Sequence, residues 1–150
     1  MLIAETISAE RVILNARVDC AKQVLRMVAE AAAIKMNLPE REILNALCER
    51  ERLGTTAVGN GISIPHARLA GAKETKAWFV RLETPVDMDA PDNAPVDLFF
   101  VLLVPESANN DHLRVLSRIA RLLRGVSNQT LIRRAETADQ IIALFEAENA

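Results

Sequence analysis

The stretch at residues 96–104 constrains the fold more than any other part of the chain, because it is the most continuously apolar. Its seven consecutive apolar residues, Leu98 to Val104, put hydrophobic side chains on both faces of a strand, and such a strand must be covered on both sides. Pro105 follows at once and, since it has no backbone N–H, is predicted to end the strand. The run is far too short to cross a bilayer as a helix, which takes about 20 residues. We therefore expect a buried central strand with a layer of structure against each face.

Helical and strand patterns alternate along the rest of the chain. Several segments carry apolar residues at helical spacing, and Asp19, Gly54 and Gly125 supply signals for their starts and ends. Strands are predicted at residues 11–18, 62–64, 77–82 and 96–104, a loop at 84–95, and helices at 20–36, 39–53, 112–124, 128–135 and 138–147. This interleaving predicts the α/β class with a layered structure, and 150 residues suit a single domain, residues 1–150.

The composition narrows the classes of function. The net charge is −2 and the aromatic residues are four Phe and one Trp, so neither a basic surface nor stacking platforms favour nucleic-acid binding. Cys20 and Cys48 are expected to be free thiols, buried or half-buried, in a reducing compartment. With two histidines and no Cys-x-x-Cys motif, no metal site is predicted. No signal-peptide pattern is found, so we expect a cytoplasmic protein without a cofactor and without direct membrane insertion.

The glycine-rich run that ends at His66 carries the most informative local chemistry. Residues 62–64 alternate as a short strand would. Pro65 is predicted to end that strand and to leave His66 at a strand-to-loop junction, with open space ahead. Gly59 and Gly61 can take positive φ and present backbone N–H groups to an anion. Because a neutral imidazole is a competent nucleophile toward phosphorus, the run predicts phosphoryl chemistry on His66.

Three separated motifs in the chain resemble the enzyme IIA proteins of the bacterial phosphotransferase system, in the fructose, mannitol and nitrogen-regulatory branch. The motifs are Gly54-Thr55-Thr56 followed by Gly59-Asn60-Gly61-Ile62-Ser63-Ile64-Pro65-His66, then Arg50-Glu51 upstream, and Asp111-His112-Leu113 followed by Val115-Leu116-Ser117. The resemblance covers essentially the whole chain and implies an enzyme IIA type 2 domain, an α/β/α sandwich with a mixed β-sheet flanked by helices. It also implies that His66 is the phosphoacceptor, that His112 and Arg50 stabilise the phosphoryl group, and that Gly59, Asn60 and Gly61 form a phosphate-binding loop.

Each candidate residue also has a structural interpretation. A histidine after a proline is often only a loop residue, and His112 can be an exposed, inert residue in the first turn of a helix. Arg50 can be a solvated cation at a helix end, where Arg41, Arg52 and Arg68 also crowd. Four arginines on the helix predicted at 112–124 form either a solvated face, opposite apolar residues that include Leu113, or a docking stripe for an acidic partner. These are Arg114, Arg118, Arg121 and Arg124.

Within the resembled branch, the chain is most like the nitrogen-regulatory enzyme IIA. The favoured interpretation is a phosphohistidine-carrying regulatory protein that receives its phosphoryl group from an upstream phosphohistidine carrier of the HPr or NPr type. It would control protein targets such as kinases or ion-transport regulators according to its phosphorylation state. The alternative is a sugar-specific enzyme IIA that passes phosphate to a separate enzyme IIB for fructose- or mannitol-type uptake.

Two points stay open from the sequence: whether the protein counts as a transferase enzyme, and which ring nitrogen of His66 reacts. The apolar residues around His66 are expected to dock a partner that phosphorylation then repels. They are Val58, Ile62, Ile64 and Leu69.

Overall fold

The computed structural model describes residues 1–147, and its central element is strand β6 (Val96–Pro105). Residues 98–104 of β6 are all buried, and their side chains alternate between two hydrophobic clusters on opposite faces. Phe99, Val101 and Leu103 belong to one cluster, whereas Leu98, Phe100, Leu102 and Val104 belong to the other. The predicted central strand with a layer against each face is confirmed.

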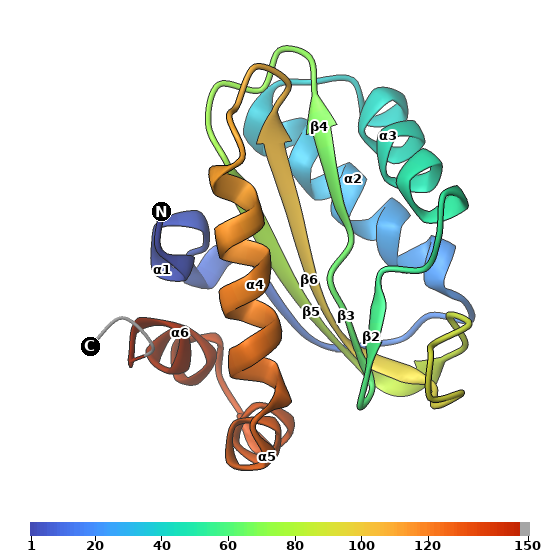
Figure 1. Ribbon diagram of the computed structural model, residues 1–150, viewed down its shortest axis with the longest axis vertical. Coiled ribbons are helices and arrows are strands. Elements are labelled where there is room, and N and C mark those ends of the chain that lie inside the picture. The colour runs from blue at the N-terminus through green and yellow to red at the C-terminus, as the bar shows by residue number, and fades with distance from the viewer. Residues whose placement is uncertain (148–150) are drawn as a thin grey trace.

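Within the described residues, β6 lies inside a six-stranded mixed sheet of order β1-β5-β6-β3-β2, and β4 also pairs with β6 (Figure 1). The other strands are β1 (Val12–Ala16), β2 (Ala57–Gly59), β3 (Ile62–Ser63), β4 (His66–Leu69) and β5 (Lys76–Val86). β5 runs antiparallel to β6 along one edge, while β3 and β4 follow one another in parallel along the other edge. In this register His66 lies opposite Leu102, beside the middle of the central strand.

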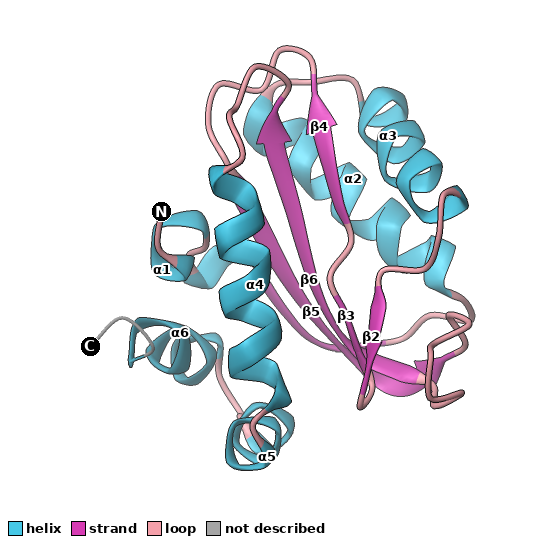
Figure 2. Cartoon of the chain, viewed as in Figure 1, coloured by secondary structure: helices cyan, strands magenta, loops and turns pink. Residues whose placement is uncertain are grey.

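Helices cover both faces of the sheet (Figure 2). One face is covered by α2 (Ala21–Met36) and α3 (Glu40–Arg52). The other is covered by α1 (Ile3–Thr6), α4 (Asp111–Arg124), α5 (Val126–Arg134) and α6 (Ala138–Ala147), and a 3₁₀ turn at Ala9–Arg11 precedes β1. Val115, Ile119 and Leu123 of α4 are fully buried, and their spacing of four residues gives one apolar stripe toward the sheet. The predicted α/β/α sandwich is confirmed.

The segment around Pro65 differs from the prediction, because the proline does not end the strand. Its carbonyl oxygen accepts the backbone N–H of Leu102 at 2.9 Å, and the chain continues extended into β4. Proline removes a donor but leaves its carbonyl free to pair, so the extended path along β6 survives. His66 is therefore the first residue of a strand, held by pairing, and not a residue at a strand-to-loop junction.

Three smaller expectations also need correction. β5 continues to Val86, so the predicted loop at 84–95 begins later, and a register shift between Arg81 and Val86 accommodates Pro85. The elements before β1 were not predicted because they are too short to show a period. Cys20 is exposed and Cys48 is half-buried, both as free thiols, so only Cys48 has the expected burial.

Candidate functional site

His66 lies in a pocket of about 480 Å³ that opens between α3 and α4. Among the described strands β4 pairs with β6 alone, so its free edge lies between the helices that cover opposite faces of the sheet. Three segments far apart in the sequence meet here, since His66 comes from β4, Arg50 from the last turn of α3 and His112 from the first turn of α4. The remaining lining residues are Ala46, Glu49, Leu53, Ala67, Arg68 and Val104.

The two ring nitrogens of His66 have different partners, and these partners fix the tautomer. Nδ1 lies 2.9 Å from the carbonyl oxygen of Ile64, and a carbonyl oxygen only accepts, so Nδ1 carries the proton. Nε2 accepts a hydrogen bond of 3.2 Å from Nε of Arg50, so Nε2 holds the lone pair. The ring therefore presents Nε2 as its nucleophilic atom, which the sequence left open.

Burial is the main reason that the pKa of His66 is lowered from its ordinary value of 6.5. The hydrogen bond to the Ile64 carbonyl opposes this effect, while the positive charge of Arg50 and the neighbouring His112 add to it. A lowered pKa keeps the imidazole neutral at pH 7. The lone pair on Nε2 is thus available for attack on an electrophile.

Arg50 is held in place at both ends of its guanidinium group. Besides the bond from Nε to His66, Nη1 donates to the carbonyl oxygen of Gly54 at 2.9 Å, just after the end of α3. Within residues 1–147 these bonds engage two of the five guanidinium N–H donors, and the others remain available to an anion placed at Nε2. Of the four arginines near the glycine run, Arg50 is the one that contacts His66.

His112 is buried, with 7% of its surface exposed, so the interpretation of it as an exposed helix residue is wrong. Its Nδ1 lies 3.2 Å from the carbonyl oxygen of Asn109, which again places the proton on Nδ1. Arg68 steadies the loop before α4, because its Nη1 donates to the carbonyl oxygens of Glu106 and Ala108 at 3.2 and 2.7 Å. The loop geometry thereby fixes His112 against the pocket of His66.

A buried polar network, not identified from the sequence, anchors the loop after α3. The Glu51 carboxylate accepts hydrogen bonds from both the backbone N–H, at 3.2 Å, and the hydroxyl of Thr56. The Ser63 hydroxyl lies 2.9 Å from the Thr56 hydroxyl, and both of these residues are buried. The network ties the end of α3, which carries Arg50, to β3, which leads to His66. The sequence signal for it is the Gly54-Thr55-Thr56 motif followed by Ser63.

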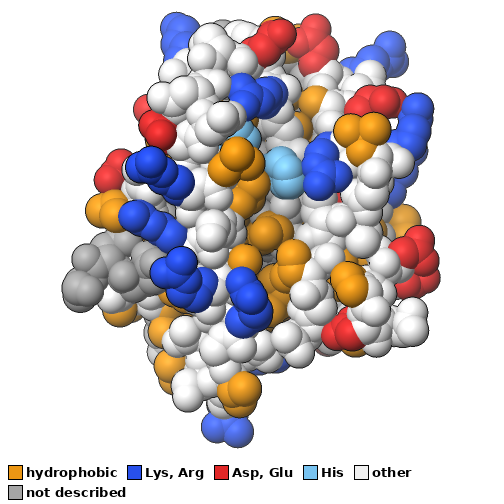
Figure 3. Space-filling view, in the orientation of Figure 1, with side chains coloured by type: hydrophobic (Ala, Val, Ile, Leu, Met, Phe, Trp, Pro, Cys, Tyr) orange, Lys and Arg blue, Asp and Glu red, His pale blue; other side chains and the backbone are white. Residues whose placement is uncertain are grey.

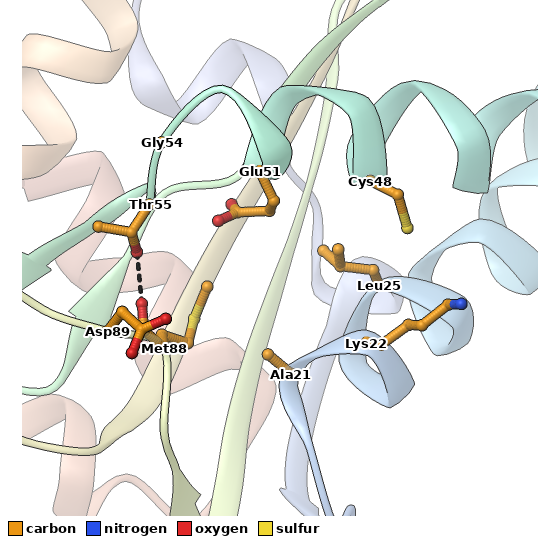
Figure 4. A pocket seen from close by; sticks show the side chains of 9 residues that line it. All are labelled: Ala21, Lys22, Leu25, Cys48, Glu51, Gly54, Thr55, Met88 and Asp89. Carbon is orange, nitrogen blue, oxygen red and sulfur yellow. Dashed lines mark hydrogen bonds between the residues drawn. The ribbon is translucent and has the colours of Figure 1, made fainter.

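A second cavity of about 570 Å³ lies on the other side of this loop (Figure 4). Figure 4 shows Glu51 at the end of α3 and Thr55 in the following loop, with the Thr55 hydroxyl donating to the Met88 carbonyl oxygen at 2.6 Å. The cavity is lined by Ala21, Lys22, Leu25, Cys48, Glu51, Gly54, Thr55, Met88 and Asp89. Thr55 thus joins the α3 loop to the loop after β5, and neither histidine lines this cavity.

The structure does not bring Gly59, Asn60 and Gly61 to His66. Asn60 and Gly61 form the turn of the β2–β3 hairpin, with φ of 58° and 78°. Five extended residue steps separate Gly61 from His66, roughly 16 Å at ~3.3 Å per residue. The Asn60 N–H donates to the Asp92 carboxylate at 2.9 Å, and its carbonyl accepts from Arg133 at 2.9 Å. The turn thus binds a carboxylate of the chain itself.

The surface around the pocket differs from the expected apolar face. Ile62, Ile64 and Leu69 are buried in the core, and of the four expected residues only Val58 is exposed, at 40%. The exposed apolar side chains that flank the histidines are instead Leu53, at 84%, and Leu113, at 51%. Figure 3 shows the pale blue histidines on this face with hydrophobic and cationic side chains beside them.

Two further observations bound the chemistry of the part of the chain that the structure describes. It holds no group of three or more His, Cys, Asp or Glu side chains arranged to bind a metal ion. Across residues 1–147, no helix combines the length and apolar character that a membrane span needs.

Comparison with known proteins relates this geometry to a family. Residues 5–148 match the family described as "Phosphoenolpyruvate-dependent sugar phosphotransferase system, EIIA 2". The nitrogen regulatory protein of Bradyrhizobium diazoefficiens is 40% identical over 145 residues, covering 97% of this chain and 95% of the relative. That of Escherichia coli K12 is 39% identical over 135 residues, covering 88% and 81%.

The solved structures include one that is similar throughout. The crystal structure of the nitrogen regulatory protein IIA-Ntr from Neisseria meningitidis superposes with a TM-score of 0.91 at 34% identity. The superposition covers 95% of this chain and 98% of the Neisseria chain. The fold resemblance therefore extends through the whole sandwich, including the elements that build the pocket.

Proposed function

Since this chain belongs to the EIIA 2 family of the phosphoenolpyruvate-dependent sugar phosphotransferase system, we propose that it accepts a phosphoryl group on Nε2 of His66. The donor is a phosphohistidine carrier protein of the HPr or NPr type. The observation that carries the proposal is the pair of hydrogen bonds on His66, with Ile64 accepting at Nδ1 and Arg50 donating to Nε2. Together they hold a neutral ring with its lone pair directed at a guanidinium.

The transfer step follows from this arrangement. The Nε2 lone pair attacks phosphorus of the incoming phosphohistidine, a new N–P bond forms, and the donor N–P bond breaks with its electron pair returning to the donor ring. The proton on Nδ1 stays in place, and the Ile64 carbonyl stabilises the positive charge that the ring of His66 acquires. Little covalent chemistry is left to the protein, so the rate depends on positioning and on charge stabilisation.

Arg50 and His112 supply the charge stabilisation in this proposal. The Arg50 guanidinium, which binds Nε2 in the resting protein, moves onto the phosphoryl oxygens when phosphorus occupies that position. His112 lines the same pocket and donates to a phosphoryl oxygen from Nε2 when it carries a second proton, because its Nδ1 proton is engaged with Asn109.

We assign the phosphorylated state a regulatory role within nitrogen-related control. The names of the relatives support this assignment, as does the position of His66 between exposed Leu53 and Leu113. Phosphorylation adds about −1.5 to −2 charges to a half-apolar surface, which changes the free energy of any protein contact made there. A partner that buries these leucines against the neutral pocket is released on phosphorylation.

The test is transfer from a phosphorylated carrier of the same genome to the wild-type protein and to His66→Ala. Acid-labile phosphate on the wild type and none on a folded His66→Ala variant support the proposal. Acid-stable phosphate, or equal labelling of both proteins, overturns it. Efficient onward transfer to a sugar-specific enzyme IIB, with partner binding unchanged by phosphorylation, favours the sugar-transport alternative.

A further inference from the structure

Helix α4 carries a row of arginines that begins one turn after His112. Arg114, Arg118, Arg121 and Arg124 lie four, three and three residues apart, which places them within an arc of roughly 120° on the helix surface. Residues 111–134 contain six arginines and one acid, although the whole chain has a net charge of −2. Positive charge is therefore concentrated on this side of the molecule.

Within residues 1–147, no carboxylate lies within 4.0 Å of any of these four guanidinium groups. Arg118 donates to the backbone carbonyl of Met1 at 3.1 Å and Arg124 to that of Ala120 at 3.3 Å, which leaves their charges unbalanced. Arg114 and Arg121 are exposed. An unpaired row of this kind is stable in water, but burying it without acceptors is costly.

The row shares a face with the phosphoacceptor pocket. Figure 3 shows cationic side chains gathered over α4 beside the two histidines. A standard protein interface covers about 800 Å² on each partner, a disc of roughly 16 Å radius. Arg121 lies nine residues after His112, or roughly 14 Å along the helix axis at ~1.5 Å per residue. A protein that places its phosphohistidine over His66 therefore covers much of the row.

We propose that the α4 arginine row, Arg114, Arg118, Arg121 and Arg124, docks an acidic surface of the protein that delivers the phosphoryl group. The inference rests on the proposed function of His66. An interface centred on the pocket has to cover these guanidinium groups, and carboxylates on the donor are the partners that compensate their desolvation. The same charges attract the donor before contact and orient its phosphohistidine toward the pocket.

The experiment measures transfer from the phosphorylated carrier protein to a double variant, Arg114→Glu with Arg121→Glu. Its matched control is Lys22→Glu with Arg26→Glu, which makes the same charge change on exposed residues of α2, on the opposite face of the sheet. We expect kcat/KM of the α4 variant to fall about tenfold or more at low salt, mainly through KM, and its dependence on salt to flatten. The α2 control should stay within about twofold of wild type.

Phosphoramidate, a small donor that needs no docking surface, separates this inference from the proposed function. All variants should be labelled on His66 by phosphoramidate at the wild-type rate, which also shows that the pocket is intact. Equal kcat/KM for the α4 and α2 variants with the protein donor, or faster transfer to the α4 variant, overturns the docking proposal. Absence of labelling of wild-type His66 by either donor overturns the proposed function, and the docking proposal falls with it.

Discussion

The carbonyl oxygen of Ile64 lies 2.9 Å from Nδ1 of His66, two residues later in the chain. The contact links a side chain to backbone that is itself held, since the Ile64 N–H donates to the Thr56 carbonyl oxygen at 3.1 Å. The ring of His66 is therefore oriented by the sheet, and its proton is kept on the side away from Arg50. The state of the reactive nitrogen is decided by a strand, and the predictions below follow from that rigidity.

Replacing Arg50 should slow phosphoryl transfer while leaving the fold intact. Arg50→Met removes a charge-assisted hydrogen bond, worth about 1.5–3 kcal/mol, so kcat/KM should fall about 10- to 150-fold. Arg50→Lys should retain part of the rate, because an ammonium keeps the charge but loses the planar fork. Stopped transfer kinetics measure both, with Arg52→Met as the control, since Arg52 pairs with Glu49 on the same helix. Equal rates for Arg50→Met and Arg52→Met would contradict the role of Arg50.

The pH dependence follows from the lowered pKa of His66. NMR titration of its ring should give a midpoint below 6.5, and the transfer rate should hold its plateau as the pH falls past that value. Arg50→Met should raise this pKa, because the Arg50 charge is one of the causes that lower it.

The same shift affects stability in a definite direction. As the pH falls below 6.5, the unfolded chain binds a proton at His66 before the folded protein does. The contribution of this group is thus fully present above its ordinary pKa and is lost as the pH falls through the lowered one. Urea unfolding of wild type and His66→Gln across this range should diverge on the acidic side, with the variant losing less stability.

His112 should contribute to stability as well as to transfer, because it is buried. His112→Ala removes a packed ring and the bond to Asn109, so the free energy of unfolding should fall by about 1–3 kcal/mol. His112→Asn can keep a donor toward Asn109 while lacking the distal ring nitrogen. We expect it to be closer to wild type in urea unfolding and yet slow in transfer. Wild-type transfer by His112→Asn would make the role of His112 purely structural.

The Glu51–Thr56–Ser63 network should be a stability determinant. Thr56→Val keeps the shape but leaves the Glu51 carboxylate and the buried Ser63 hydroxyl without their partner, at about 1–3 kcal/mol. Thr84→Val, at an exposed position of β5, should change stability by less than about 0.5 kcal/mol. Chemical denaturation compares the two, and similar losses for both would show that the network is unimportant.

Gly61→Ala should destabilise the hairpin without changing the chemistry at His66. A Cβ at this position would meet Nη2 of Arg133 at 2.6 Å and Oδ1 of Asp97 at 2.9 Å, and φ is +78°. We expect the free energy of unfolding to fall by about 1–3 kcal/mol, with labelling of His66 by phosphoramidate unaffected. Slower labelling of the folded variant would restore the phosphate-binding role that the sequence suggested for the turn.

The layered fold was predictable because its determinants are local. The apolar run at 98–104 requires cover on both faces, and the apolar stripe of α4 is readable from Val115, Ile119 and Leu123 alone. The prediction was wrong at Pro65, where a proline normally ends a strand. There the pairing of the Pro65 carbonyl with Leu102, 37 positions away, keeps the chain extended.

The sequence alone determined the family resemblance, the layered architecture and the identities of His66, His112 and Arg50 as candidates, since these depend on motifs and periodicity along the chain. Only the tertiary structure decided that Nε2 holds the lone pair, that His112 is buried and that the Gly59–Gly61 turn lies away from the pocket. These properties arise where β4, α3 and α4 meet. Proton position and burial depend on partners that are close in space and distant in sequence, so local pattern carries no record of them.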